Sequence, residues 1–285
     1  MSTKRKHGFS INWPRVILLI IIFCTLCLGI VKTTTYLKET VVTSDNINVR
    51  TGPSTSNKVL DTLKKGERIT IIREKNNWSY VSLPNTKKGW VANWILSKKN
   101  AKVTKLSEAT IVLDPGHGGN DSGALSIKDK QEKIYTLQIV KKVAYLLKKR
   151  GANVILTRDS DSYVDLAPRA KLAESNNADA FISFHFDSSP NDDEATGLTS
   201  YYYNKTADLA LANSINAELN DTGLDNRGTE FGDFLVLRDN TQPSVLLELG
   251  YINTKYDFKL IQSSSFQEKT AKSVVEGLTN YIQNK

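Results

Sequence analysis

The sequence predicts an α/β domain on a mixed, largely parallel sheet flanked by helices, preceded by a small all-β barrel and one transmembrane helix. Three observations lead to this fold class. An uncharged apolar run covers Val16–Val31, short alternating runs fill residues 40–100, and strands alternate with helices over residues 109–285. The 285 residues leave room for about two domains.

The apolar run predicts a membrane anchor. It follows four basic residues between positions 4 and 15, which is the layout of a secretory signal or a signal anchor. The run is short for a hydrocarbon core of about 30 Å, and residues 33–37 extend it. Because no small-x-small cleavage motif follows convincingly, we expect a transmembrane span over residues 16–37, with residues 1–15 cytoplasmic. The alternative is a cleaved signal peptide.

Residues 40–100 predict a small all-β domain. Thr51–Gly52–Pro53 and Lys65–Gly66 indicate turns between short alternating runs. We expect strands over Val59–Leu63, Ile69–Arg73, Trp78–Leu83 and Gly89–Ile95. Residues 101–108 are expected to form a linker to the next domain.

Charge is distributed unevenly along the chain. The net charge of +8 divides into +5 for residues 1–40, +7 for residues 41–100 and −4 for residues 101–285. An enzyme with a basic catalytic face for nucleic acid is therefore disfavoured. The basic residues of the small domain suit anionic polymers through long-range attraction, or they form only a solvated face.

Residues 109–285 show the alternation of an α/β domain. We expect a helix over Glu132–Arg150 that Gly151 ends. The expected strands are Thr110–Asp114, Val154–Thr157, Ala180–His185, Thr196–Tyr203 and Ser244–Leu249, and the other helices are Leu166–Asn176, Ala207–Leu219 and Gln267–Ile282.

Four chemically active side chains fall at one edge of this sheet. His117 follows the first strand, His185 ends the strand from Ala180, and Glu248 lies near the end of the strand from Ser244. Glu132 opens the long helix. Active sites of open α/β sheets lie at the carboxyl ends of strands, so we expect these residues to share one site.

Two imidazoles and one carboxylate are a known ligand set for hydrolytic zinc. We expect His117, Glu132 and His185 to bind Zn²⁺, with Gly116, Gly118 and Gly119 allowing close backbone approach. The alternatives are a histidine in a turn and a satisfied histidine at a strand end. The two cysteines, Cys24 and Cys27, lie in the apolar run, which excludes a cysteine zinc site or nucleophile elsewhere.

The small domain resembles the bacterial SH3 module of cell-wall enzymes. The resemblance rests on Asn48–Val49–Arg50–Thr51–Gly52–Pro53, Lys65–Gly66, Trp78 and Gly89–Trp90–Val91. It implies that the module binds wall polymer and performs no chemistry. Trp78 and Trp90 either stack on sugars or peptide, or fill a small core.

The larger domain resembles the zinc-dependent N-acetylmuramoyl-L-alanine amidases. Four motifs carry the resemblance, in the family's order: Ile111–Gly119 around His117, Glu132 before Leu137, Ser183–Phe184–His185, and Pro243–Asn253 around Glu248. Together with the anchor and the SH3-like module, the architecture is similar to staphylococcal-type wall amidases. The resemblance implies a zinc amidase fold over residues 109–285.

The resemblance also implies roles for individual residues. His117, Glu132 and His185 correspond to the metal ligands, and Glu248 to the catalytic base that passes a proton from water to the leaving amine. The alternative for Glu248 is a structural pair with Arg227 or Arg169.

Other arginines and the residues after the second histidine carry weaker expectations. Arg227 resembles a substrate-side residue of the family or serves as an ion-pair partner, and Arg158 and Arg169 are expected to be structural. After the second histidine the family usually carries a small or amide residue, whereas this chain has Phe186 and then Asp187. We therefore expect Phe186 to reshape the substrate groove, and Asp187 to orient a ligand or substrate or to cap locally.

The expected function is hydrolysis of the amide between N-acetylmuramic acid and L-alanine of the stem peptide, through water activated by zinc. The implied location is the cell membrane of a Gram-positive type of cell, with the catalytic domain facing the wall. The expected partners are peptidoglycan, anionic wall polymer and the membrane, without nucleic acid. Alternatives are another zinc peptidase or deacetylase, a non-catalytic wall-binding protein, and an enzyme that is active only with a membrane-protein partner.

Overall fold

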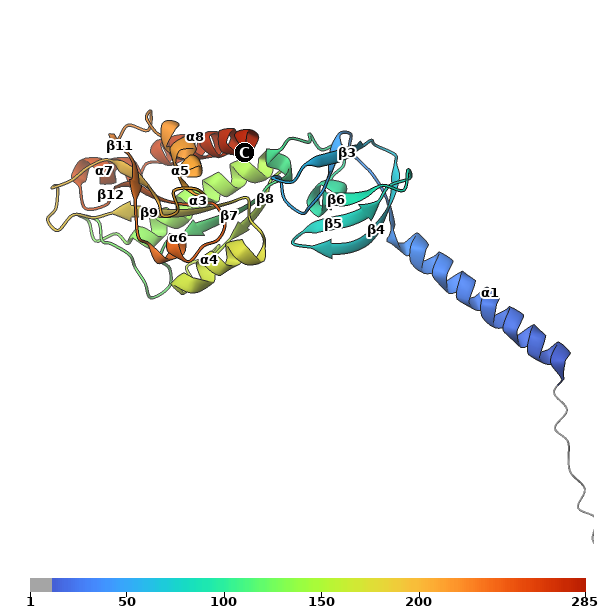
Figure 1. Cartoon of the computed structure of the whole chain (residues 1–285). Helices are drawn as coiled ribbons and strands as arrows, with labels where there is room; N and C mark the ends of the chain where they lie inside the picture. The colour runs from blue at the N-terminus through green and yellow to red at the C-terminus, as the bar shows by residue number, and fades with distance from the viewer. Residues whose placement is uncertain (1–11) are drawn as a thin grey trace, which may run out of the picture.

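The computed structural model describes residues 12–285, except for the side chains of residues 30–38, and contains two sheets in sequence (Figure 1). Most of the basic segment expected over residues 1–15 lies outside this range. The first helix, α1 (Trp13–Lys38), extends away from both sheets (Figure 1).

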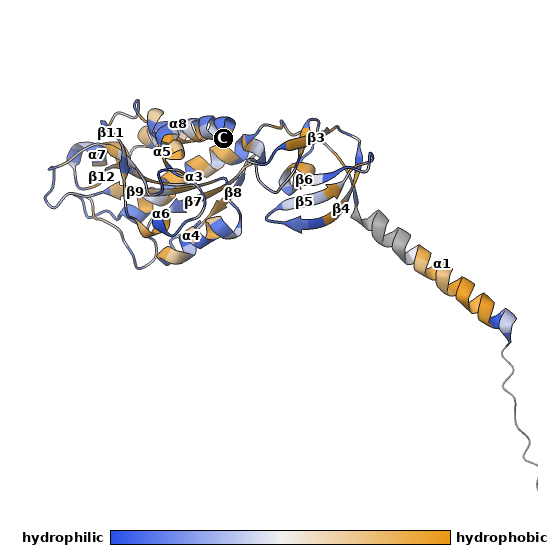
Figure 2. Ribbon diagram, viewed as in Figure 1, coloured by the Kyte–Doolittle hydropathy of each residue, from blue (hydrophilic) through white to orange (hydrophobic). Residues whose placement is uncertain are grey.

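Helix α1 contains the apolar run, and Figure 2 shows its apolar residues together. Its large apolar side chains between Ile17 and Leu28 are exposed. Within residues 12–285, however, no helix has the length and apolarity required to cross a membrane. The transmembrane span expected over residues 16–37 is therefore not supported.

The first sheet has six strands in the order β1-β4-β5-β6-β2-β3, and every pairing is antiparallel. The strands are β1 (Glu39–Val41), β2 (Ile47–Arg50), β3 (Val59–Leu63), β4 (Arg68–Lys75), β5 (Trp78–Ser82) and β6 (Lys88–Ala92), followed by the short helix α2 (Asn93–Leu96). The four strands expected from the sequence are present, although the one expected over Gly89–Ile95 ends at Ala92, where α2 takes over; β1 and β2 were missed. Trp78 and Trp90 are both buried in the core of this sheet, so the core-filling interpretation is the correct one.

The second sheet is mixed and largely parallel, as expected. Its strands are β7 (Thr110–Pro115), β8 (Asn153–Leu156), β9 (Ala180–Asp187), β10 (Leu198–Tyr202), β11 (Asn226–Phe231) and β12 (Ser244–Tyr251). They run in the order β11-β10-β12-β9-β7-β8, and only β10 and β12 pair antiparallel. The central strands β12, β9 and β7 end at the same edge, because they are parallel to one another.

Helices cover both faces of the second sheet (Figure 1). One face packs against α3 (Glu132–Lys149), α5 (Leu209–Ala217), α7 (Lys255–Ile261) and α8 (Ser264–Asn284). The other face packs against α4 (Leu166–Ser175) and α6 (Leu235–Arg238). Each layer buries an apolar stripe, and α3 illustrates this with Ile139, Val143 and Leu147 at helical spacing.

Buried polar contacts join the two sheets. The Arg50 guanidinium on β2 pairs with Glu108, which ends the 3₁₀ turn Leu106–Glu108, and both side chains are almost inaccessible to solvent. Beside this pair, Asp179 accepts hydrogen bonds from the hydroxyl groups of Ser54 and Thr55. We call these contacts between Arg50, Ser54, Thr55, Glu108 and Asp179 the clamp. Residues 101–108, expected to be a linker, thus end at Glu108, which is buried and paired with Arg50.

Candidate metal centre

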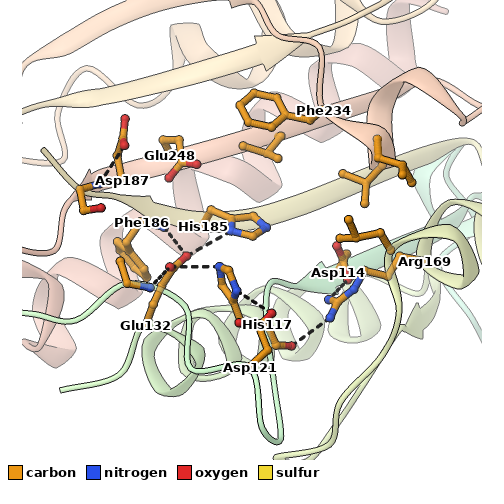
Figure 3. A pocket seen from close by; sticks show the side chains of 16 residues that line it. Asp114, His117, Asp121, Glu132, Arg169, His185, Phe186, Asp187, Phe234 and Glu248 are labelled. Carbon is orange, nitrogen blue, oxygen red and sulfur yellow. Dashed lines mark hydrogen bonds and ion pairs between the residues drawn. The ribbon is translucent and has the colours of Figure 1, made fainter. Parts of the chain in front are cut away.

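A cleft of about 410 Å³ opens at the edge where β7, β9 and β12 end (Figure 3). Polar side chains, among them His117, His185 and Glu248, form one side of the cleft. The lining also includes apolar side chains, among them Leu166 and Phe234. The sequence-based expectation of a site at this edge is consistent with this cavity.

His117, Glu132 and His185 converge in the cleft although they come from three separate elements. One ligand atom from each lies within 4.8 Å of the others. The distance from His117 Nε2 to Glu132 Oε2 is 3.1 Å, and the distance from His185 Nδ1 to Glu132 Oε1 is also 3.1 Å. Three such donors at these separations form a group that fits a divalent transition-metal ion.

Glu132 is the buried centre of this group. It is the first residue of α3, and its two carboxylate oxygens accept hydrogen bonds from the backbone amides of Ala124 and Phe186. Burial alone raises the pKa of Glu132, but the neighbouring His117 and His185 outweigh burial and hold that pKa well below its ordinary value. The carboxylate is therefore ionised and available as a ligand at neutral pH.

His117 is held in an unusual backbone conformation. Its φ of 61° lies in the left-handed region, which non-glycine residues seldom occupy. Asp121 Oδ2 lies 2.9 Å from His117 Nδ1, on the side of the ring away from Glu132. Burial lowers the pKa of His117, but the contacts with Glu132 and Asp121 give a net increase.

Gly116 provides the close approach that the glycine-rich motif predicts. A Cβ atom at this position would lie 2.3 Å from Cε1 of His185. Any larger residue would therefore displace the imidazole. The backbone next to His117 thus sets the position of the second histidine.

Arg158 and Arg169 hold the loop that follows β7, in agreement with the structural role predicted for them. Arg158 donates to the backbone carbonyls of Pro115 and Gly116. Arg169 pairs with the buried Asp114 at 2.8 Å and donates to the carbonyl of His117. The ends of β7 and α4 are thereby fixed to each other.

Glu248 faces the cleft from β12, directly beside His185 in the sheet register. Among the residues that the structure describes, its Oε2 atom is buried without a hydrogen-bond partner. Burial first, and then the negative charges of Glu132 and Asp187, raise the pKa of Glu248 well above its ordinary value. The predicted alternative of an ion pair is not observed, since Arg169 pairs with Asp114 and Arg227 donates to the Tyr251 hydroxyl.

The three predicted substrate residues, Phe186, Asp187 and Arg227, lie in different environments. Phe186 is 2% exposed and its side chain packs in the core, yet the residue also lines the cleft, so its effect on the groove stays a prediction. Its backbone amide holds Glu132. Asp187 lines the cleft, whereas exposed Arg227 lies beyond it and reaches Tyr251, the neighbour of Asp187 in the register.

Two residues of the site were missed from the sequence. Asp121 lies only four residues after His117, so its closeness in the sequence was a signal for this contact. Phe234 lies between β11 and α6, in a segment where the sequence predicted no element. No local periodicity could have assigned Phe234 to the cleft, because the contact depends on how α6 packs on the sheet.

An α/β sheet with two imidazoles and one carboxylate gathered at the carboxyl edge of its strands is typical of metal-dependent hydrolases. Residues 111–280 match the family model described as N-acetylmuramoyl-L-alanine amidase, and residues 45–97 match the bacterial SH3 domain. The chain therefore belongs to the N-acetylmuramoyl-L-alanine amidase family and carries a bacterial SH3 domain.

Relatives and solved structures agree with this assignment. A protein of Staphylococcus saprophyticus described as a probable cell wall amidase, LytH, is 36% identical over 288 residues, covering 97% of this chain and 96% of its own. The catalytic domain of the amidase CwlV from Bacillus (Paenibacillus) polymyxa is 36% identical with a TM-score of 0.60, over 62% of this chain and 99% of its own. The amidase AmiC2 of Nostoc punctiforme is 38% identical with a TM-score of 0.60, over 64% of this chain and 99% of its own.

Proposed function

We propose that this chain hydrolyses the amide bond between the lactyl group of N-acetylmuramic acid and L-alanine of the peptidoglycan stem peptide. The observation that carries the proposal is the convergence of His117, Glu132 and His185 beside Glu248 in one cleft. Family membership supports the choice of bond.

In this proposal, His117, Glu132 and His185 hold Zn²⁺. The donor set fits, because two neutral imidazoles and an ionised carboxylate are ligands that hydrolytic zinc prefers. When bound, zinc lowers the pKa of water to about 7 and polarises the scissile carbonyl. The hydrogen bonds to Glu132 keep its carboxylate oriented toward both imidazoles.

Glu248 acts as the proton carrier in the proposed reaction. Its unpartnered Oε2 accepts the proton of the attacking water and returns it to the nitrogen of the departing L-alanine. Its position beside His185 in the sheet register supports this role. Asp187 and Arg227 contact the substrate at the end of the cleft near Tyr251, where Arg227 offers a cation to a peptide carboxylate.

The proposal is tested with the full chain, loaded with zinc, on purified peptidoglycan. The expected products are glycan strands without peptides and intact peptides with a newly free L-alanine amine. Glu248→Gln should lose activity by about 10²–10⁴-fold and retain zinc, whereas His117→Ala should lose both. New reducing sugars or cleavage within the peptide would contradict the proposal, and release of acetate would indicate a deacetylase.

We also propose that the first sheet binds anionic wall polymer. The support is the net charge of +7 over residues 41–100 together with the SH3 family match. Binding to isolated walls should weaken as the salt concentration rises, because long-range attraction is screened. Binding that is independent of salt would contradict the role of charge.

We propose further that α1 attaches the enzyme to the outer surface of a membrane, so that the catalytic cleft faces the wall. Its exposed apolar side chains support this placement. The full chain should sediment with membranes, and a chain that begins at residue 39 should not. An activating membrane protein is a separate proposal, which requires that membranes restore activity to an otherwise inactive enzyme.

A further inference from the structure

Several apolar side chains that line the cleft have no role in the chemistry proposed above. They include Leu166 at the start of α4 and Phe234, Leu235 and Val236 at the start of α6. Phe234 is 37% exposed although it is a large aromatic residue at the mouth of a cavity. Figure 3 shows it across the cleft from His117 and Asp121.

Phe234 is held in this position by two direct contacts and by the packing of the residues that follow it. Its ring meets Tyr201 edge to face, with centroids 5.2 Å apart and planes at 66°. Gly232 lies against the ring, where a Cβ atom would come within 2.5 Å of it. Val236 and Leu237 fix the following turn of helix in the core. The ring is therefore a preformed surface, so a ligand that stacks on it loses little freedom of the protein.

The two sides of the scissile amide differ in chemistry. The acyl side carries a sugar ring with apolar C–H faces, a lactyl methyl group and an acetamido methyl group. The peptide side carries carboxylates after its first residue. Among the described residues that line the cleft, the arginine is Arg169, and its charge is already paired with buried Asp114.

From these observations we infer that Phe234 is the platform on which the muramic acid ring of the glycan strand rests. Aromatic faces and apolar C–H surfaces associate through burial and dispersion. The peptide then runs toward Asp187 and Arg227, where a cation is exposed. The inference rests on the proposed amidase activity and assigns a direction to the substrate within the same cleft.

The test uses the full chain with zinc and soluble, uncrosslinked glycan–peptide strands. Phe234→Ala should raise KM about 10-fold, since one stacked ring is lost, and should leave kcat within about twofold. Phe234→Tyr should restore KM. Phe231→Ala is the matched control, because Phe231 is 60% exposed on the same segment but does not line the cleft.

Product inhibition separates a sugar platform from a peptide contact. Peptide-free glycan strands should inhibit Phe234→Ala about 10-fold more weakly than wild type, and the free stem peptide should inhibit both equally. The inference is overturned if the inhibition constant of the free stem peptide changes instead of that of the glycan strands. It is also overturned if Phe231→Ala has the same effect as Phe234→Ala. Phe234→Leu keeps apolar volume without the ring, and it should reproduce the KM increase if the alanine variant unfolds.

The two proposals fail in distinguishable ways. If the wild-type enzyme releases no L-alanine amine from any substrate, the proposed function is wrong whatever Phe234 does. If the wild type is active and Phe234→Ala has an unchanged KM and an unchanged glycan inhibition constant, only the platform is wrong.

Discussion

Asp121 shows how a residue outside the three candidate ligands shapes the site. Its carboxylate lies 2.9 Å from Nδ1 of His117 and favours the tautomer whose Nε2 is free to face Glu132. We predict that Asp121→Ala weakens zinc binding by about 10–100-fold, measured by competition with a chelator. Asp159→Ala, an exposed acid, is the control, and an unchanged affinity in Asp121→Ala would contradict the prediction.

Glu248 makes the zinc-free protein sensitive to pH. Its raised pKa means that the folded state retains a proton that the unfolded state has lost above about pH 4.5. The free energy of unfolding therefore falls as pH rises from the unfolded pKa toward the folded one. We predict that zinc-stripped Glu248→Gln lacks this fall, measured by denaturant unfolding across that range. Parallel pH profiles for the two proteins would refute the assignment.

At the level of residues, the sequence predicted which side chains form the candidate metal site better than it predicted how neighbouring side chains are buried. His117, Glu132 and His185 were expected together because motif and strand-end placement agreed, and the structure brings them together. The effect of Phe186 on the groove stays a prediction, because its side chain is 2% exposed while the residue also lines the cleft. Phe186 follows His185 on β9 and its side chain is buried in the core, and motif comparison alone does not report which side chains of a strand are buried.

Among the elements, β7 and α4 depend on one buried ion pair. Arg169 on α4 neutralises Asp114 on β7 and also supports the carbonyl of His117. We predict that Arg169→Ala lowers the free energy of unfolding by about 3–5 kcal/mol, because it removes the salt-bridge partner of the buried Asp114 charge. Lys171→Ala, at an exposed position of the same helix, is the control. Equal loss in both variants, measured by urea unfolding, would show that the pair is dispensable.

The elements predicted from the sequence are those with strong periodicity. The α3 prediction held to within one residue at its end, because Gly151 adopts a φ of 97° there. The structure adds β1, β2, α2, β11, α6 and α7, which are short or polar. Such segments owe their structure to pairing with distant strands, as β1 does with β4, and a local pattern does not contain that information.

In the whole molecule, the clamp joins the two sheets through a buried charge. We predict that Arg50→Ala lowers the free energy of unfolding by about 3–5 kcal/mol and exposes residues 101–108 to protease, because Glu108 loses its partner. Arg68→Ala is the control, since Arg68 is exposed and its pair with Glu39 is long at 4.0 Å. Unchanged proteolysis of Arg50→Ala would show that other contacts hold the sheets together.

The clamp also has a mechanical consequence for an enzyme that works on an elastic polymer. Arg50, Thr55 and Asp179 fix one sheet to the other. If the first sheet binds wall polymer as proposed, the distance between the bound strand and the bond to be cut is therefore constant. Stretching the wall changes the spacing of its strands but not this distance. Cleavage should therefore depend on wall tension. The enzyme should cut only strands whose separation matches the fixed distance between the first sheet and the cleft.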